Sequence, residues 1–236
     1  MKPIGRIAEV WRYPVKSFAG ESLTSCQVES YGLYGDRFYT FSDESKQGWN
    51  SFVTARDIPQ MLTYEARLLE DELIVRSPEG ATFSWGDKLL EEMARHARRP
   101  ITMRERRAPH PEYPELMSVD EGSILILLAP MLDKLEQAWG KKLDSRRFRA
   151  NLIIETEDLA ATDEAWIGRS LRMGNAVVKV DSRCDRCSIV TMDPDTTERD
   201  ASLLKQINEG LDLCFGVYAS VKETGIITVG DSVYEV

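Results

Sequence analysis

Residues 182–196 read SRCDRCSIVTMDPDT and contain two of the four cysteines of the chain, Cys184 and Cys187. Arg183 and Arg186 stand beside them, and nearby positive charge favours the thiolate form of a cysteine over the thiol. An apolar segment and an acidic turn follow. From these residues alone the pair can be a metal site, a redox couple, a covalent nucleophile or part of a buried core.

Zinc and thioredoxin-like chemistry both fit this spacing poorly. A structural zinc site takes four ligands, and the remaining candidates, Cys26, Cys214, His96 and His110, each stand alone in the sequence. A redox pair opens a helix that follows a strand, whereas residues 188–193 (SIVTMD) are predicted to form a strand. A buried pair remains open. A thiolate among cations also suits a soft metal that an anionic cofactor carries.

Composition limits the classes of partner. The 236 residues include 30 basic and 39 acidic side chains, a net charge of -9, which argues against a nucleic-acid surface. The chain has no secretory h-region and no apolar run of about 18 residues, so we expect a cytoplasmic protein without a membrane contact. Four cysteines are too few for a secreted disulfide framework. A basic run at residues 95–107 is interpreted as a solvated helix end and the loop after it.

Alternating apolar residues predict a strand-rich α+β protein with two β-rich halves. The proline-rich segment 106–122 is the predicted boundary. Residues 63–85 are predicted as two strands joined by a turn at Ser77–Gly80, and Gly140 is predicted to end a helix. The other predicted strands are 6–15, 22–30, 37–43, 151–155, 171–184, 189–193, 215–225 and 226–236, and the predicted helices are 86–99, 129–143 and 200–210.

Several short motifs, in this order, resemble those of the MOSC-domain family, the family named after the C-terminal domain of molybdenum cofactor sulfurase. The similarity covers nearly the whole chain and is greatest to the branch with the mitochondrial amidoxime-reducing and bacterial hydroxylaminopurine-detoxifying proteins. The motifs are YPVKS (13–17), GDRFY (35–39), TARDIP (54–59), RFRANLII (147–154), WIG (166–168), RCSIVTMDPDT (186–196), FGVY (215–218) and ITVGDSVY (227–234).

The resemblance implies an N-terminal β-barrel, residues 1–98, packed on a MOSC-type β-barrel with flanking helices, residues 110–236. It also implies a molybdenum cofactor, a pterin dithiolene with a phosphate tail, and no pyridoxal phosphate. Cys187 matches the thiolate that ligates the metal and is the predicted catalytic residue, while Cys184 is interpreted as a neighbouring or core sulfur. The predicted cofactor-binding residues are Lys16, Ser17, Arg37, Arg56, Ser123, Arg149, Asn151, Arg186 and Cys187.

Arginine suits this role because its planar fork matches phosphate oxygens. We expect Arg149 and Asn151, two residues apart on a predicted strand, to face the same ligand. Asp193 and Asp195 are interpreted as turn formers. The chain departs from the family pattern at Ala150, where a proline is usual, and at Thr197, where a glycine is usual.

The activity that the resemblance implies is two-electron reduction of the N–O bond in small N-hydroxylated substrates. The four cysteines leave none for a 2Fe–2S cluster of the kind that some relatives carry. Electrons are therefore expected from a separate protein, a ferredoxin or a flavoprotein. Two alternatives stay open: a sulfur carrier with a persulfide on Cys187, and a non-enzymatic module that binds or stores the molybdenum cofactor.

Overall fold

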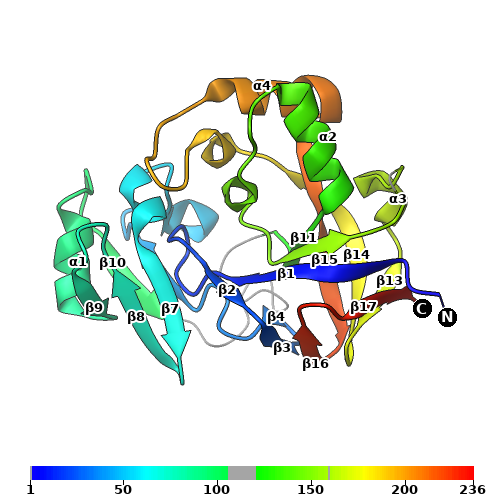
Figure 1. Ribbon diagram of the computed structural model, residues 1–236. Helices are drawn as coiled ribbons and strands as arrows, with labels where there is room; N and C mark the ends of the chain where they lie inside the picture. Colours follow the sequence, from blue (N-terminus) through cyan, green and yellow to red (C-terminus); the bar gives the residue numbers. More distant parts are fainter. Residues whose placement is uncertain (1, 106–120, 159) are drawn as a thin grey trace.

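The first strand of the chain closes a barrel that is otherwise built from the second half. In the computed structural model, which describes residues 2–105, 121–158 and 160–236 (Figure 1), β1 pairs with β12 on one side and β17 on the other. The seven strands thus form a closed ring, which leaves no unpaired sheet edge. In ring order they are β1 (Gly5–Arg12), β12 (Leu152–Glu155), β11 (Ile124–Leu128), β15 (Cys214–Glu223), β14 (Ala176–Asp185), β13 (Ser170–Met173) and β17 (Ser232–Glu235), with β2 (Glu21–Leu23) attached to β1.

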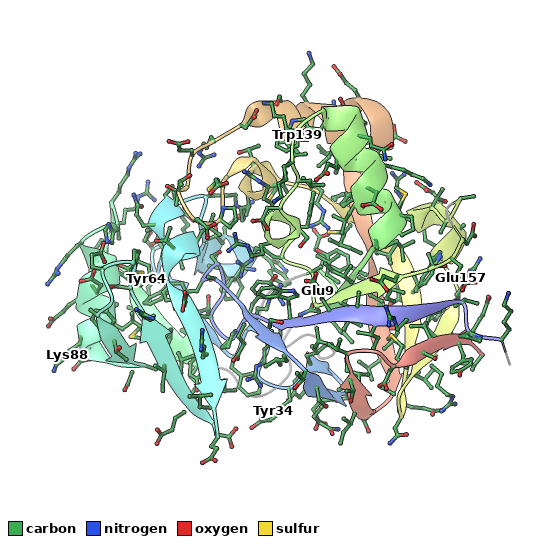
Figure 2. All side chains as sticks on the ribbon, in the orientation of Figure 1. Glu9, Tyr34, Tyr64, Lys88, Trp139 and Glu157 are labelled. Atoms are coloured by element: carbon green, nitrogen blue, oxygen red, sulfur yellow. The ribbon has the colours of Figure 1, made fainter. Side chains whose placement is uncertain are left out.

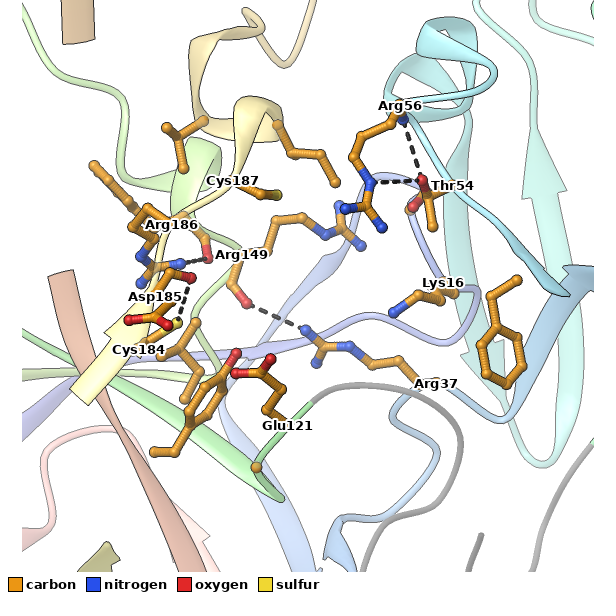
Figure 3. Close-up of a pocket in the computed structure, with 18 of the residues that line it drawn as sticks. Lys16, Arg37, Thr54, Arg56, Glu121, Arg149, Cys184, Asp185, Arg186 and Cys187 are labelled. Carbon is orange, nitrogen blue, oxygen red and sulfur yellow. Dashed lines mark hydrogen bonds between the residues drawn. The ribbon is translucent and has the colours of Figure 1, made fainter. Parts of the chain in front are cut away.

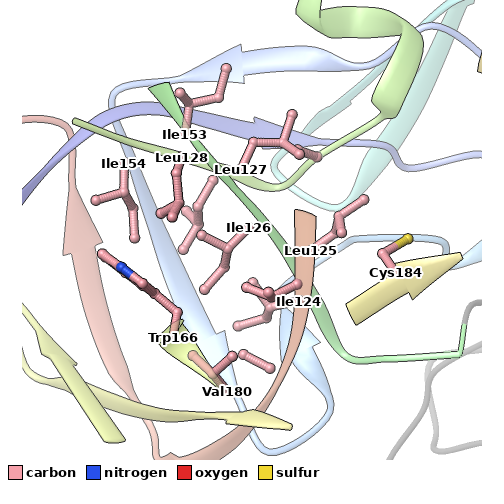
Figure 4. Packing of buried hydrophobic residues seen from close by; sticks show 14 of the residues in the cluster. Ile124, Leu125, Ile126, Leu127, Leu128, Ile153, Ile154, Trp166, Val180 and Cys184 are labelled. Atoms are coloured by element: carbon pink, nitrogen blue, oxygen red, sulfur yellow. The ribbon is translucent and has the colours of Figure 1, made fainter. Parts of the chain in front are cut away.

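Strand β11 is the most apolar element of this barrel. Its sequence, ILILL, is buried at every position, and each such side chain contributes about 1.5–3 kcal/mol relative to an exposed one. Figure 4 shows the same core receiving Ile153 and Ile154 from β12, with Trp166 nearby. β11 and β12 run parallel, and the connection between them contains the crossover helix α2 (Ala129–Trp139), which packs against both strands.

Helices α2 and α4 end where the local backbone turns left-handed. Gly140 has φ 72° after α2, as predicted, whereas α4 (Ala201–Leu211) continues past Gly210 and ends at Asp212 with φ 52°. The indole N–H of Trp139, at the end of α2, donates to Ser202 at the start of α4 (2.9 Å; Figure 2). Among the described residues, no helix is long and apolar enough to cross a bilayer. The other two helices are α1 (Asp87–Ala94) and α3 (Asp163–Trp166).

The N-terminal half has its own aromatic core between two three-stranded sheets. The strands of these sheets do not form a closed ring in the described residues. A third sheet pairs β3 with β16, so β3, like β1, belongs structurally with the second half. The sheets are β10-β5-β6, β7-β8-β9 and β16-β3-β4, made of β3 (Ser25–Glu29), β4 (Gly32–Leu33), β5 (Tyr39–Ser42), β6 (Phe52–Val53), β7 (Glu65–Leu69), β8 (Glu72–Arg76), β9 (Thr82–Ser84), β10 (Thr102–Glu105) and β16 (Gly225–Thr228).

The strand-rich α+β fold is confirmed, but several local predictions were wrong. Residues 171–184 and 226–236 were each predicted as one strand, and each range contains parts of two: β13 and β14 in the first, β16 and β17 in the second. Residues 63–85 contain three strands, because the chain also turns at Glu70 and Asp71, which both have positive φ. Residues 188–191 form a 3-10 helix, η4 (Ser188–Thr191), in place of the predicted strand. The predicted boundary lies almost wholly outside the described residues. The remaining 3-10 helices are η1 (Gly48–Ser51), η2 (Pro59–Thr63) and η3 (Ser145–Phe148).

The departure at Thr197 has a conformational consequence. Thr197 has φ 63°, a conformation that glycine adopts freely and a β-branched residue does not. Thr197→Gly is expected to raise the free energy of unfolding by about 1 kcal/mol, measured by urea denaturation. Thr196→Gly is the matched control, and it should lower stability because the Thr196 hydroxyl accepts a hydrogen bond from the Glu198 N–H (3.3 Å). A loss of stability in Thr197→Gly contradicts this account.

Candidate functional site

A cationic pocket of about 540 Å³ lies where the barrel meets the N-terminal half (Figure 3). Its described lining has six cations, Lys16, Arg37, Arg56, Arg147, Arg149 and Arg186, against two carboxylates, Glu121 and Asp185. The pocket is therefore positive in a chain whose net charge is -9. Eight of the nine predicted cofactor-binding residues line it: Lys16, Ser17, Arg37, Arg56, Arg149, Asn151, Arg186 and Cys187. Ser123 does not.

Two of the guanidinium groups lie over the ring of Tyr13. Arg149 lies 4.3 Å and Arg37 4.8 Å from the ring centroid, distances at which the π face attracts a cation. Arg149 also donates to the carbonyl of Phe18 (2.7 Å), and Arg37 donates to the backbone carbonyl of Arg149 (3.3 Å). Arg37 is further paired with the buried carboxylate of Asp36. Burial raises the pKa of Tyr13 to about 12, against the lowering effect of both guanidinium groups, so its hydroxyl stays neutral.

Three lining residues adopt a backbone conformation that side chains disfavour. Ser17, Arg37 and Arg149 have φ values of 69°, 54° and 56°. Each such residue costs roughly 1–2 kcal/mol relative to a right-handed conformation. Strain of this kind concentrates where a side chain must be held in one direction for function. Three of the eight non-glycine residues with positive φ in the described ranges line this one pocket, which makes it the candidate functional site.

Arg149 is placed differently from the prediction. It follows η3 in a left-handed turn, so it does not share a strand face with Asn151. Asn151 is fully buried, its amide oxygen accepts from the N–H of Leu125 (3.0 Å), and its amide N–H donates to the carbonyl of Trp11 (3.3 Å). Asn151 therefore joins β1 and β11 beside the pocket, through its amide oxygen and one amide N–H.

Arg186 is buried beside Cys187 and is only partly satisfied. Its Nε donates to the carbonyl of Phe215 (2.7 Å) and its Nη1 to the carbonyl of Phe148 (3.0 Å), whose ring also lies under the guanidinium group. Its Nη2 is buried and has no hydrogen-bond partner among the described residues. A buried N–H without a partner is costly. Nη2 lies against Gly216 in the barrel wall, 3.1 Å from the position that a Cβ would take there. The N–H of Gly216 donates to Asp163 (2.7 Å), whose other carboxylate oxygen is also buried without a partner, so Arg186 adds positive charge to the pocket while its Nη2 faces the barrel.

The two cysteines of the motif lie in different surroundings. Both cysteines line the pocket, but Cys187 is exposed at the N-terminal end of η4, whereas Cys184 is 1% exposed and packs in the barrel core. In Figure 3, Cys187 lies on one side of the pocket and Lys16 on the other. No cluster of three or more His, Cys, Asp or Glu suited to a metal ion occurs in the described ranges. A metal at Cys187 thus needs ligands from a bound molecule, which a dithiolene supplies.

The other thiols and cations of the region serve structural roles. Cys214 donates to the carboxylate of Asp185 (3.0 Å), and burial, then this hydrogen bond, raises its pKa to about 11, so it stays protonated at neutral pH. Arg183 does not line the pocket but pairs with Glu164 (3.1 Å) on α3. Trp166 is buried in the core.

Sequence reasoning missed Arg147 and Tyr13. Arg147 lines the pocket and pairs with Asp193 (2.9 Å), whose other oxygen accepts from the N–H groups of Asp195 and Thr196 (3.0 Å each). Asp193 is therefore a turn former, as predicted, and also holds the η3 segment against η4. Both missed residues lie inside quoted motifs, but their partners are over 20 residues away in the chain, so spacing alone gives no signal.

Two family assignments cover almost all of the chain. The MOSC domain family matches residues 114–234, and the MOSC N-terminal beta barrel domain family matches residues 4–105. The chain belongs to the MOSC-domain family. It is 25% identical to mitochondrial amidoxime reducing component 2 of Bos taurus, over 100% of this chain and 84% of the relative. It is 27% identical to mitochondrial amidoxime-reducing component 1 of Homo sapiens, over 99% and 84%.

Two further similarities concern one segment of the sequence and the overall fold. A segment of 76 residues, 31% of this chain, is 41% identical to molybdenum cofactor sulfurase of Bombyx mori and covers 9% of that protein. The crystal structure of the YUAD protein from Bacillus subtilis matches with a TM-score of 0.51 and 11% identity, over 97% of this chain and 93% of that one. This structural likeness supports the fold alone.

The charge of the pocket can be measured through the reactivity of Cys187. An anionic disulfide reagent, dithiobis-nitrobenzoate, is expected to react faster with Cys187 than neutral dithiodipyridine does, relative to free cysteine. Arg149→Gln should slow only the anionic reagent, roughly fivefold for a lost interaction of about 1 kcal/mol, and added salt should do the same.

Reaction rates at pH 8 provide the measurement, with Cys187→Ser as the control that identifies the reacting thiol. Arg172→Gln, on β13, is the matched charge control and should leave both rates unchanged. Equal slowing of the two reagents by Arg149→Gln shows a loss of structure instead and contradicts the electrostatic account.

Proposed function

We propose that this protein binds a molybdenum cofactor in the cationic pocket and reduces the N–O bond of small N-hydroxylated compounds. The observation that carries the proposal is the combination, in one pocket, of an exposed thiol with six cations. The named relatives that align over the full chain are amidoxime-reducing components. An amidoxime is an N-hydroxylated compound of this class.

The residues present fit such a cofactor. Cys187 would provide the protein thiolate to the metal, a soft ligand for a soft centre. Arg186 is adjacent to it in the chain, and its buried charge would help to compensate the negative charge of the cofactor. Lys16 and Arg37 lie on the side of the pocket away from Cys187 (Figure 3), where they would hold the phosphate. Arginine binds phosphate oxygens through paired N–H groups and lysine through its charge.

When bound, the cofactor supplies two-electron redox chemistry, which none of these side chains can provide. The reaction consumes two electrons and two protons, breaks the N–O bond, and releases the oxygen as water. An external ferredoxin or flavoprotein would supply the electrons. The role of the protein is to orient the substrate beside Cys187, to compensate the negative charge of the cofactor, and to keep both inside a pocket that the two halves of the fold enclose.

A sulfur-carrier function is the second candidate. The exposure of Cys187 favours it, because a persulfide must reach an acceptor, and the local identity to a molybdenum cofactor sulfurase fits as well. This function requires labile sulfur on Cys187 and no dependence on molybdenum. Storage of the cofactor without turnover is distinguished by the absence of activity in protein that holds molybdenum.

The cysteine variants test the proposal. Protein from a host that makes the cofactor should reduce benzamidoxime to benzamidine with reduced methyl viologen as electron donor. Cys187→Ala should lose this activity. Cys184→Ala should keep most of it, at a stability cost of about 1–3 kcal/mol, since only a buried sulfur is removed from the core. Amidine formation, molybdenum content and urea denaturation are the measurements.

Two results would overturn the assignment of roles. Equal loss of activity in folded Cys184→Ala and Cys187→Ala would indicate a shared two-thiol site. Labile sulfur on Cys187, in protein that contains no molybdenum although the host makes the cofactor, would replace the reductase by the sulfur carrier.

A further inference from the structure

A second positive groove, of about 500 Å³, lies directly beside the cationic pocket. We call it the basic groove. Its described lining includes five cations and two carboxylates, and Arg56 lines both the groove and the pocket. Arg98 and Arg99 belong to the basic run at residues 95–107, which was interpreted from the sequence as a solvated helix end and loop, and both line the groove. The charged residues of the groove are Lys46, Arg56, Arg98, Arg99, Arg199, Asp43 and Asp57.

The carboxylates of the groove are committed to local contacts and do not neutralise it. Asp57 accepts from the backbone N–H of Thr54 (3.0 Å) and so shapes the turn that carries Arg56. Asp43 accepts from Ser45 through one oxygen, and its other oxygen faces both Lys46 (3.6 Å) and Arg99 (3.7 Å). One carboxylate thus faces two cations. The side chain of Arg99 remains 67% exposed, so its charge is available at the surface.

The groove and the pocket share Arg56, and a small apolar cluster lies in the adjoining segments. Ala55, Leu62 and Met192 form a small buried cluster, against which Ile189 packs. Ile189 is two residues after Cys187 and lines the pocket, whereas Met192 pairs through a β-bridge with Arg199 of the groove. The segment that carries Cys187 and lines the pocket is thus connected to the groove through the bridge between Met192 and Arg199.

We propose that the basic groove is the docking surface for an acidic electron-carrier protein. This inference rests on the proposed function, which needs an external source of electrons and names none. A carrier must approach the redox centre closely without entering the substrate pocket, and the groove provides that approach beside Cys187. Because the chain as a whole carries -9, an acidic carrier is repelled by most of the surface and attracted here. Such patterning orients the encounter and raises its rate.

Charge reversal in the groove tests this docking. The variant combines Arg98→Glu and Arg99→Glu, two exposed residues that do not line the pocket. The matched control combines Arg172→Glu on β13 and Lys222→Glu on β15, and it changes the net charge by the same amount. Residues 98 and 99 come shortly after α1 in the chain. Strand β13 lies on the opposite side of the molecule from α1 (Figure 1). The probes are an oxidised plant-type 2Fe–2S ferredoxin and an oxidised flavodoxin, both acidic.

The expected result has three parts. Calorimetric titration should show binding of at least one carrier to the wild type, weakened about tenfold or more by the groove variant and much less by the control. Binding should also weaken between 50 and 300 mM salt, as the Debye length falls below about 10 Å. Turnover with the reduced carrier should fall in parallel in the groove variant, whereas turnover with methyl viologen should stay at the wild-type rate.

The inference is overturned if neither carrier binds the wild type, if the groove variant and the control lose affinity equally, or if single-stranded DNA binds the groove more tightly than either carrier. A wild-type protein that binds a carrier through the groove but shows no turnover with methyl viologen contradicts the proposed reductase and leaves the docking surface standing. The two claims therefore fail separately.

Discussion

The stacking of Arg37 and Arg149 on the ring of Tyr13 is the contact on which the pocket depends. Two guanidinium groups beside one small cavity repel each other, and here a π surface, the carboxylate of Asp36 and backbone carbonyls offset that repulsion. The same contact joins the two halves of the chain, since Arg149 donates to Phe18 in the first half. The site thus exists only when both halves are folded and packed together.

The pocket also concentrates conformational and electrostatic strain that the barrel around it stabilises. Ser17 and Arg149 hold left-handed backbone conformations next to the barrel strands. Asn151 connects β1 to β11 through its amide oxygen and one amide N–H. Arg186 is fixed by two carbonyls, to which its Nε and Nη1 donate. A site prepared in this way gains more from an anionic ligand than a flexible surface does, because ordering the side chains on binding costs little.

Local patterns predicted much of the fold, and long-range pairing limited the rest. Strand alternation and the C-cap at Gly140 were readable because neighbouring residues determine them. The closure of the barrel was not, because β1 pairs with strands that begin over 140 residues later. Residues 188–191 have strand-like composition but form a 3-10 helix that carries Cys187 to the pocket. The site residues came from motif resemblance. Asn151 was predicted in the same way and lines the pocket, and its hydrogen bonds to the barrel could not be read from the sequence because they join distant segments.

The molybdenum and pterin content of purified protein tests the central claim most directly. Wild-type protein from a host that makes the cofactor should contain molybdenum and pterin in nearly equal amounts, approaching one of each per chain. The Arg149→Ala variant, compared at equal folded fraction, should retain far less of both, because the pocket loses the guanidinium group that stacks on Tyr13. Wild-type protein that carries neither molybdenum nor pterin, or an Arg149→Ala variant with unchanged occupancy, would contradict the account.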